Sequence, residues 1–204
     1  MRRQNLRSTI SDDVADDDSQ PVMVPRSDRM LVATSPERAR RLRKHLVMTM
    51  RTTTNRAHPV SPLRPEPVGF AARVAYAACS LCKGWCCKGG GDHAFLDEPT
   101  IARVRSERPE LDTHAVVRLY GERVPVVGYE GSCVFHGKHG CTLDRSLRSD
   151  VCNSYFCSGL HSYMTGSDAA TPVVVIAGEG GKIHTSPVLL PQAAMPRDTP
   201  IKHS

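Results

Sequence analysis

The sequence predicts a small α+β fold made of short helices and one or two hairpins. Three observations lead to this prediction. Apolar residues recur at helical spacing in several short stretches, strand-like runs flank glycine turns, and all ten aromatic residues lie between Phe70 and Tyr163. Residues 1–68 hold no glycine, cysteine or aromatic residue. The chain therefore divides into an N-terminal extension over 1–68, a central domain over 69–165, and a hairpin with a loose tail over 166–204.

The N-terminal extension is basic. It holds 13 Lys and Arg residues against 8 Asp and Glu, whereas the rest of the chain holds 14 against 13. Its first 34 residues mix both charges with few apolar side chains, so the extension is expected to be largely disordered. Residues 36–51 instead predict a helix, because Leu42, Leu46 and Met50 recur at helical spacing. This helix is interpreted either as an arm that is solvated or docked on the central domain, or as a contact for nucleic acid or an acidic surface.

Local signals predict the remaining elements. Phe70–Ala78 is compatible with a helix, and two further helices are expected, one with Asp97 as its cap and one over Asp112–Tyr120. The prolines within His58–Val68 indicate an extended linker. The other expected elements are a strand over Arg123–Tyr129, a hairpin or knuckle over Cys133–Leu143, a short helix over Leu147–Leu160 and a hairpin over Thr171–Thr185.

Eight cysteines point to the chemistry of the chain. They are Cys79, Cys82, Cys86, Cys87, Cys133, Cys141, Cys152 and Cys157. Zinc and iron–sulfur clusters both favour thiolate ligands that converge from closely spaced positions. Buried structural thiols do not gather at such spacings, and a disulfide framework is typical of secreted chains. All eight cysteines are therefore predicted to be metal ligands, and the fold is expected to be organised around a cysteine-ligated metal centre.

The vicinal pair, Cys86 and Cys87, restricts how the ligands can be shared. Neighbouring side chains diverge by about 100° in a helix and point to opposite sides of an extended segment. The two thiols are therefore not expected to chelate one ion together. Two arrangements follow: two centres with four ligands each, or a single cluster that uses one member of the pair.

Other candidate residues give weaker signals. His136 and His139 lie between two cysteines and could replace a thiolate, and His93 follows the triple glycine. The glycine-rich stretch over 178–182 lacks the spacing of a phosphate-binding loop and is interpreted as a hairpin turn. A Cys–His hydrolase is disfavoured, because no cysteine stands apart from the cluster as a nucleophile.

The N-terminal sequence suggests a cytoplasmic protein. Charged residues over 1–7 are followed by an acidic stretch rather than by the apolar segment of a secretory signal. No run approaches the 18 apolar residues typical of a membrane span, so no membrane partner is expected.

The order of the cysteines resembles that of the YkgJ-type cysteine-cluster family, described as a zinc- or iron-chelating domain. The matching motifs are Cys79-x2-Cys82-x3-Cys86-Cys87, then Cys133, Gly140-Cys141, Cys152 and Tyr155-Phe156-Cys157, within residues 76–160. The family usually has two residues before its vicinal pair, where this chain has three. It often has Arg-Pro before the late cysteines, where this chain has Arg148-Ser149.

The first functional hypothesis is a protein that holds an iron–sulfur cluster or zinc through its cysteines, with no assigned biological role. The resemblance also implies a second hypothesis, because a similar module occurs in flagellin lysine methylases. The protein would then be a cluster-dependent enzyme, either similar to a protein lysine methylase or a redox enzyme, acting on a protein partner. The third hypothesis is a nucleic-acid accessory protein that uses the basic helix over 36–51.

Overall fold

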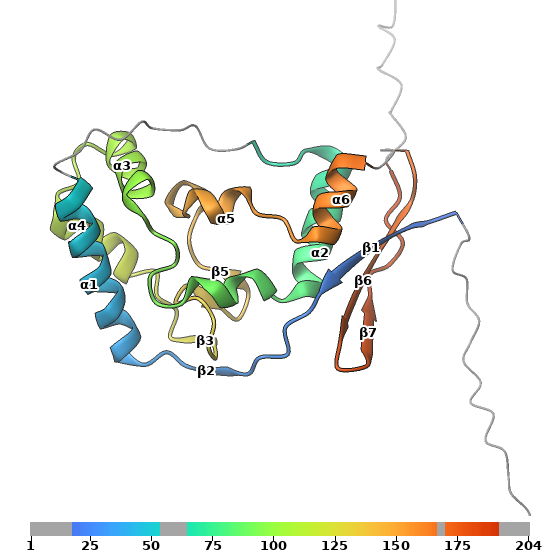
Figure 1. Ribbon diagram of the computed structural model, residues 1–204, viewed down its shortest axis with the longest axis horizontal. Coiled ribbons are helices and arrows are strands. Elements are labelled where there is room, and N and C mark those ends of the chain that lie inside the picture. The colour runs from blue at the N-terminus through green and yellow to red at the C-terminus, as the bar shows by residue number, and fades with distance from the viewer. Residues whose placement is uncertain (1–17, 54–64, 167–169, 192–204) are drawn as a thin grey trace, which may run out of the picture.

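The computed structural model describes residues 18–53, 65–166 and 170–191. The fold is mixed α+β, as the sequence predicts, with short helices and two small sheets (Figure 1). Most of the linker predicted over His58–Val68 and the tail from residue 192 lie outside the described residues. None of the helices in the described ranges has both the length and the apolar character needed to cross a membrane.

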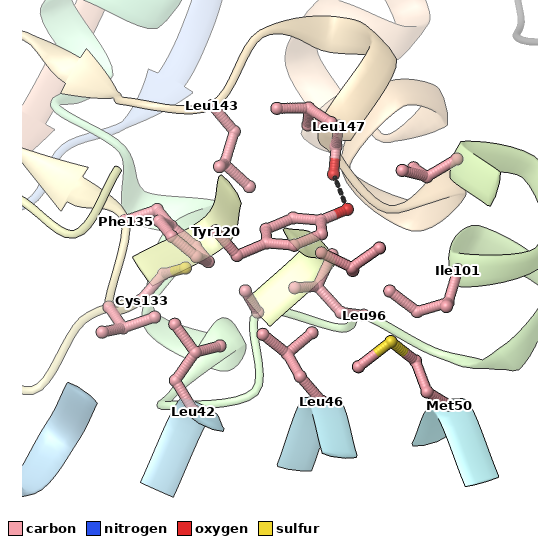
Figure 2. Close-up of a cluster of buried hydrophobic side chains, with 14 residues drawn as sticks. Leu42, Leu46, Met50, Leu96, Ile101, Tyr120, Cys133, Phe135, Leu143 and Leu147 are labelled. Atoms are coloured by element: carbon pink, nitrogen blue, oxygen red, sulfur yellow. Dashed lines mark hydrogen bonds between the residues drawn. The ribbon is translucent and has the colours of Figure 1, made fainter. Parts of the chain in front are cut away.

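The first hydrophobic core, called here the helical core, is built from α1 (Pro36–Thr53), α3 (Glu98–Glu107) and α4 (Thr113–Gly121). The helix predicted over 36–51 is thus confirmed as α1, and it is docked on the rest of the molecule. Its buried side chains include the three apolar residues that helical spacing predicts, Leu42, Leu46 and Met50 (Figure 2). The Tyr120 hydroxyl donates to the Leu147 carbonyl at 2.9 Å and closes the opposite side of this core (Figure 2).

The predicted cap of α3 is confirmed, and α4 has a cap of the same kind. The Asp97 carboxylate accepts a hydrogen bond from the Thr100 N–H at 3.0 Å. The Asp112 carboxylate accepts one from the Ala115 N–H at 2.7 Å. Each cap satisfies a backbone donor that a helix N-terminus leaves without an intrahelical partner.

The second hydrophobic core, called here the sheet core, packs two helices against a three-stranded sheet. The helices are α2 (Gly69–Cys82) and α6 (Ser158–Gly166). The strands are β1 (Gln20–Pro25), β6 (Val173–Glu179) and β7 (Lys182–Thr185), in the order β1-β6-β7. The predicted C-terminal hairpin is confirmed as β6 and β7.

The expected disorder of the first 34 residues is wrong for residues 20–33. β1 pairs in parallel with β6, and Val22 and Val24 are buried. β2 (Leu31–Ala33) pairs antiparallel with β3 (Val127–Tyr129), the only part of the strand expected over Arg123–Tyr129 that forms. The prolines of β1 fit because β1 is an edge strand, where a missing N–H breaks no ladder on the outer side.

Several short elements lie between the two cores, around α5 in the middle of Figure 1. These elements are η1 (Trp85–Gly90), β4 (His136–Gly137), β5 (Gly140–Cys141), η2 (Arg145–Leu147) and α5 (Asp150–Ser154). β4 and β5 form the hairpin expected after Cys133 and extend the sheet of β2 and β3. All eight cysteines lie on these elements, on the end of α2, or directly beside them.

Candidate metal centre

The first two cysteines lie on the last turn of α2. Cys79 and Cys82 are three residues apart, so their side chains emerge on one face of the helix. α2 ends because Lys83 and Gly84 both have left-handed backbone angles, with φ values of 49° and 66°. This reversal leads the chain directly into η1, which carries the vicinal pair. The N–H of Trp85 donates to the Cys82 sulfur at 3.3 Å.

Gly84 is the point where this turn meets the β4–β5 hairpin. A Cβ added there would lie 2.4 Å from the His136 ring, so only glycine fits. His136 is buried, hydrogen-bonds the Ser132 hydroxyl at 2.8 Å and packs on Tyr129. Burial, aided by the positive charge of Arg29, lowers the pKa of His136 to about 4. His136 is thus a neutral packing residue at neutral pH.

Cys133 is fixed against the backbone of η1. Its N–H donates to the Cys87 carbonyl at 2.9 Å, and the Val134 N–H donates to the Gly91 carbonyl at 2.8 Å. Gly90 makes this approach feasible, because a Cβ there would lie 2.9 Å from the Cys133 Cβ. The hairpin is therefore docked on the loop that carries the vicinal pair.

The two late cysteines lie on separate elements, so the single helix expected over Leu147–Leu160 is wrong. Cys152 is inside α5, and Cys157 directly precedes α6. The chain is extended at Tyr155, and the burial of Leu160 in the sheet core draws the next helix away from α5. Ser149, which stands where the resemblance expects proline, caps α5 by accepting from the Cys152 N–H at 3.1 Å.

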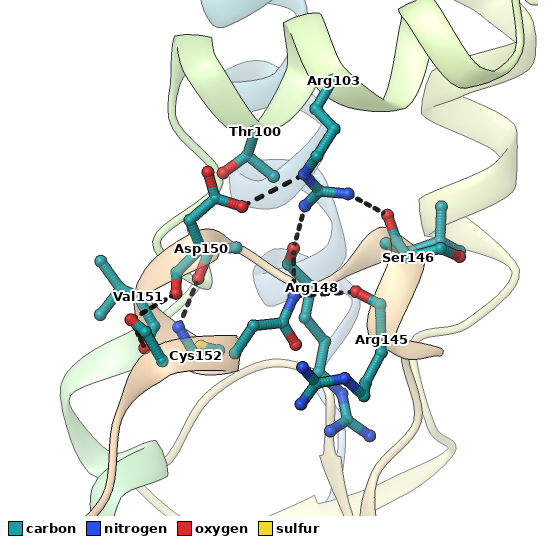
Figure 3. Close-up of polar contacts among 12 residues, drawn as sticks. Thr100, Arg103, Arg145, Ser146, Arg148, Asp150, Val151 and Cys152 are labelled. Carbon is teal, nitrogen blue, oxygen red and sulfur yellow. Dashed lines mark hydrogen bonds and ion pairs between the residues drawn. The ribbon is translucent and has the colours of Figure 1, made fainter. Parts of the chain in front are cut away.

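A buried arginine holds the segment that leads into α5. Arg103 of α3 is 2% exposed and donates to the carbonyls of Ser146 and Arg148, each at 2.7 Å (Figure 3). Its Nε donates to the Asp150 carboxylate at 3.2 Å. A buried guanidinium is tolerated only when its donors are satisfied, and here three of its partners lie just ahead of Cys152.

The eight thiols fall into two groups according to which of them influence one another electrostatically. The pKa of Cys79 is raised by Cys82, Cys86 and Cys157, and that of Cys133 by Cys141 and Cys152. The pKa of Cys87 is raised by Cys133 and Cys141 and also by the adjacent Cys86. The α2 thiol group consists of Cys79, Cys82, Cys86 and Cys157. The hairpin thiol group consists of Cys87, Cys133, Cys141 and Cys152. The groups adjoin, because Cys86 also influences Cys152 and the Cys87 thiol donates a hydrogen bond to Cys86.

Burial and neighbouring thiols keep most of these cysteines protonated at neutral pH. Although Cys79 has exposed surface, partial desolvation of its thiol, with Cys82 and Cys86 nearby, raises the pKa of Cys79 to about 11. Burial raises the pKa of Cys133 to about 12. The hydrogen bond within the vicinal pair acts in opposite directions, lowering the pKa of Cys86 to about 7 and raising that of Cys87. Cys86 is therefore the thiol most readily ionised in its group.

The thiols lie near one another, but they are not arranged as a complete set of ligands for a metal ion. All eight are free cysteines within the described residues. Over residues 18–53, 65–166 and 170–191, no three Cys, His, Asp or Glu side chains are arranged to hold a metal ion. Protonated thiols do not attract one another, and convergence on one point requires a cation that displaces their protons. The donor chemistry of both groups suits zinc or an iron–sulfur cluster.

The basic residues around the cysteines have distinct partners. Lys88 places its ammonium 3.7 Å from the centre of the Trp85 ring, and Arg145 pairs with Glu66 at 2.7 Å. Arg148 donates from its Nε to the Leu143 carbonyl at 2.8 Å, and its positive charge lowers the pKa values of both Cys79 and Cys152. The charge of Arg38 acts in the same way on Cys133.

The other two candidate histidines lie apart from the thiols in their contacts. His93 accepts a hydrogen bond from the Phe95 N–H at 3.1 Å and packs near the ring of His45. His139 is exposed in the turn between β4 and β5.

Sequence reasoning missed Arg103 and Ser149. Arg103 stands between Ile101 and Val104, which are both fully buried, so a charge inside an apolar stretch was the available signal. Ser149 precedes Asp150 in a pattern that suits a helix cap, which was also visible.

No protein-family model matches the chain, and no curated protein or solved structure matches it either.

Proposed function

We propose that this protein binds metal through its eight cysteines as two sets of four, holding iron–sulfur clusters or zinc. The observation that carries the proposal is geometric: Cys82 and Cys157 lie with the sheet core, whereas Cys133 and Cys87 lie with the helical core, so the thiols divide into two groups that adjoin at the vicinal pair. Four thiolates complete the ligand set of one zinc ion or one iron–sulfur cluster. This reading agrees with the resemblance to the YkgJ-type family.

The surroundings of the thiols favour a bound cation. Desolvation raises the pKa values of Cys79 and Cys133, so their thiolates are unfavourable alone, and a bound metal ion would supply the positive charge that stabilises them. The N–H of Trp85 already donates to the Cys82 sulfur, a hydrogen bond that would orient and stabilise a ligating thiolate. Arg148 adds positive charge beside both groups.

The two metals would supply different chemistry. An iron–sulfur cluster transfers single electrons, whereas a four-thiolate zinc ion crosslinks the chain and stabilises the fold. In either case, the chain's own residues set the position of each sulfur: Gly84 and Gly90 bring the hairpin against η1, and Arg103 holds the segment before Cys152.

Anaerobic purification tests the proposal directly. The full-length protein is expected to carry iron or zinc, measured by elemental analysis, and iron–sulfur clusters would add visible absorbance. A colourless protein without iron or zinc, even after anaerobic reconstitution with iron, sulfide or zinc, would contradict the proposal.

Two matched substitutions separate two centres from one. Cys86→Ser and Cys87→Ser change adjacent positions, and each is expected to remove about half of the bound metal, because each belongs to a different group. Ser80→Ala, at an exposed neighbour of Cys79, is the control and should retain all metal. If only one of the two cysteine variants lost metal, a single cluster would replace the two-centre arrangement.

Metal affinity is expected to increase with pH. Desolvation raises the pKa values of Cys79 and Cys133 to about 11 and about 12, so these thiols are protonated at neutral pH without metal. Each must lose its proton on binding, so zinc affinity should rise between about pH 6 and pH 8. Competition with a chromophoric chelator measures this, and an affinity independent of pH would argue against thiolate ligation.

A further inference from the structure

The face of α1 that is turned away from the helical core carries a groove of about 380 Å³. Its six lining residues all lie on this single helix. They are Arg40, Arg43, Lys44, Val47, Met48 and Arg51. The helix therefore has one face committed to the core and another that combines positive charge with apolar surface.

Within residues 18–53, 65–166 and 170–191, few acidic side chains neutralise the cations of this groove. Arg43, Lys44 and Arg51 have no acidic partner among the described residues, and Arg40 pairs only with Glu37, an exposed residue of its own helix. By contrast, Arg41 of the same helix is bound to Asp92. The charge that remains available is thus concentrated around the groove.

The floor of the groove is apolar. Met48 is 58% exposed and Val47 is half-buried, and both lie between Lys44 on one side and Arg51 on the other. An exposed methionine flanked by cations suits a partner that supplies both an apolar side chain and carboxylates. A nucleic-acid backbone would use the cations alone and leave Met48 without an apolar partner.

We propose that this α1 groove binds an acidic protein segment in which carboxylates flank an exposed apolar side chain. From Arg40 to Arg51 the helix rises about 16 Å, which is the length of about three helical turns of a partner lying alongside. The apolar side chain would rest on Met48, and the carboxylates would pair with Arg43, Lys44 and Arg51.

The test uses the full-length protein and a labelled synthetic peptide of about twelve residues, three helical turns, in which glutamates flank two leucines. Fluorescence anisotropy is expected to show salt-dependent binding. The double variant Arg43→Glu/Lys44→Glu should weaken binding by about tenfold or more. Met48→Ser should weaken it by about threefold or more, through lost apolar burial. Arg118→Glu, an exposed charge reversal on α4, should leave binding unchanged.

These variants alter exposed side chains, so the buried stripe of α1 and the metal content should be unaffected. That separates this proposal from the proposed metal binding, since either can fail alone. Absence of peptide binding would overturn the proposal. It would also be overturned if duplex DNA of matched charge bound more tightly than the peptide and Met48→Ser had no effect, because the groove would then be a surface for nucleic acid.

Discussion

The two cores of the molecule are stabilised in different ways. The helical core surrounds a buried charged network, in which Arg103 ties α3 to three positions ahead of Cys152. The sheet core depends instead on close backbone packing: α6 crosses β1 so tightly that a Cβ on Gly159 would lie 1.7 Å from the Met23 carbonyl oxygen. The helical core thus depends on the hydrogen bonds of a buried arginine. The sheet core depends on a glycine that leaves room for the backbone of the neighbouring strand.

The thiol groups follow this division. Cys82 is buried in the sheet core and Cys157 packs against it, and both belong to the α2 thiol group. Cys133 is buried in the helical core and Cys87 packs against it, and both belong to the hairpin thiol group. Each core thus holds two members of one thiol group, and the two groups meet at the adjacent residues Cys86 and Cys87. A substitution in one core is therefore expected to reduce hydrogen-exchange protection in that core before the other.

Gly159→Ala should have the largest effect on stability. The added Cβ would clash with the backbone of β1 rather than with a side chain that can move away. We expect a loss of more than about 3 kcal/mol in the free energy of unfolding. Hydrogen exchange should show the earliest loss of protection in α2, α6 and β6. The fluorescence of Trp85, which packs against this core, should report the same transition.

Gly166→Ala is the matched control in the same helix, because a Cβ there meets nothing within 4 Å. It should be neutral or stabilise by up to about 1 kcal/mol. If hydrogen exchange in the Gly159→Ala variant showed an equal loss of protection in both cores, the two cores would unfold as a single unit.

Arg103→Met should weaken the helical core. The substitution keeps much of the side-chain length but leaves the carbonyls of Ser146 and Arg148 without their donor. We expect a loss of about 2 to 3 kcal/mol, with reduced hydrogen-exchange protection in α3 and in the segment before α5. Arg105→Met, two residues along the same helix and without a described ion pair, should change stability little. If both variants behaved alike, the buried network would not distinguish this core from the other.

The elements that were predictable from the sequence have local signals. Asp97 was identified as a cap because an aspartate before a helix can accept a hydrogen bond from a backbone N–H of the first turn. The C-terminal hairpin was visible because its strands are separated only by a short glycine turn. β1 was missed, since its partner residues are far along the chain, as in the pairing of Gln20 with Val173.

The candidate site was predictable as a set of residues but not as an arrangement. The spacing of the cysteines and the divergence of neighbouring side chains were enough to suggest two sharing schemes. The neighbours of each thiol were not accessible, because they depend on the turn at Gly84, the docking of Cys133 on η1 and the break between α5 and α6. Each of these is a long-range contact with no counterpart in local sequence.

His136, in the β4–β5 hairpin, should make the free energy of unfolding depend on pH. Burial lowers its pKa to about 4, below the ordinary value of 6.5, so the folded protein binds fewer protons than the unfolded chain between these values. The stability present above about pH 6.5 is therefore lost as pH falls toward 4, by on the order of 2 kcal/mol. Urea unfolding at a series of pH values should show a shallower loss for His136→Asn than for the unmodified protein. His139→Asn, in the exposed turn, should keep the original slope.

The smallest effect is expected at Asp92, which secures α1 to the loop after η1. Burial opposes ionisation of Asp92, but hydrogen bonds from Arg38 and Arg41, each at 2.6 Å, outweigh it and hold the pKa below its usual value. This contribution is present above the unfolded pKa and is lost as pH falls through the folded one. Asp92→Asn should cost about 1 kcal/mol at neutral pH, and less at high salt because Arg41 is exposed.

Glu37→Gln is the control for this prediction, since Glu37 pairs with the arginines of the first turn of α1 only at the surface. It should change the free energy of unfolding by less than about 0.5 kcal/mol. An equal cost for both variants would mean that Asp92 adds no more than a surface ion pair. In that case α1 would be held to the helical core by its apolar stripe and by neutral-acceptor contacts such as that between His45 and the Leu96 carbonyl, rather than by its ion pairs.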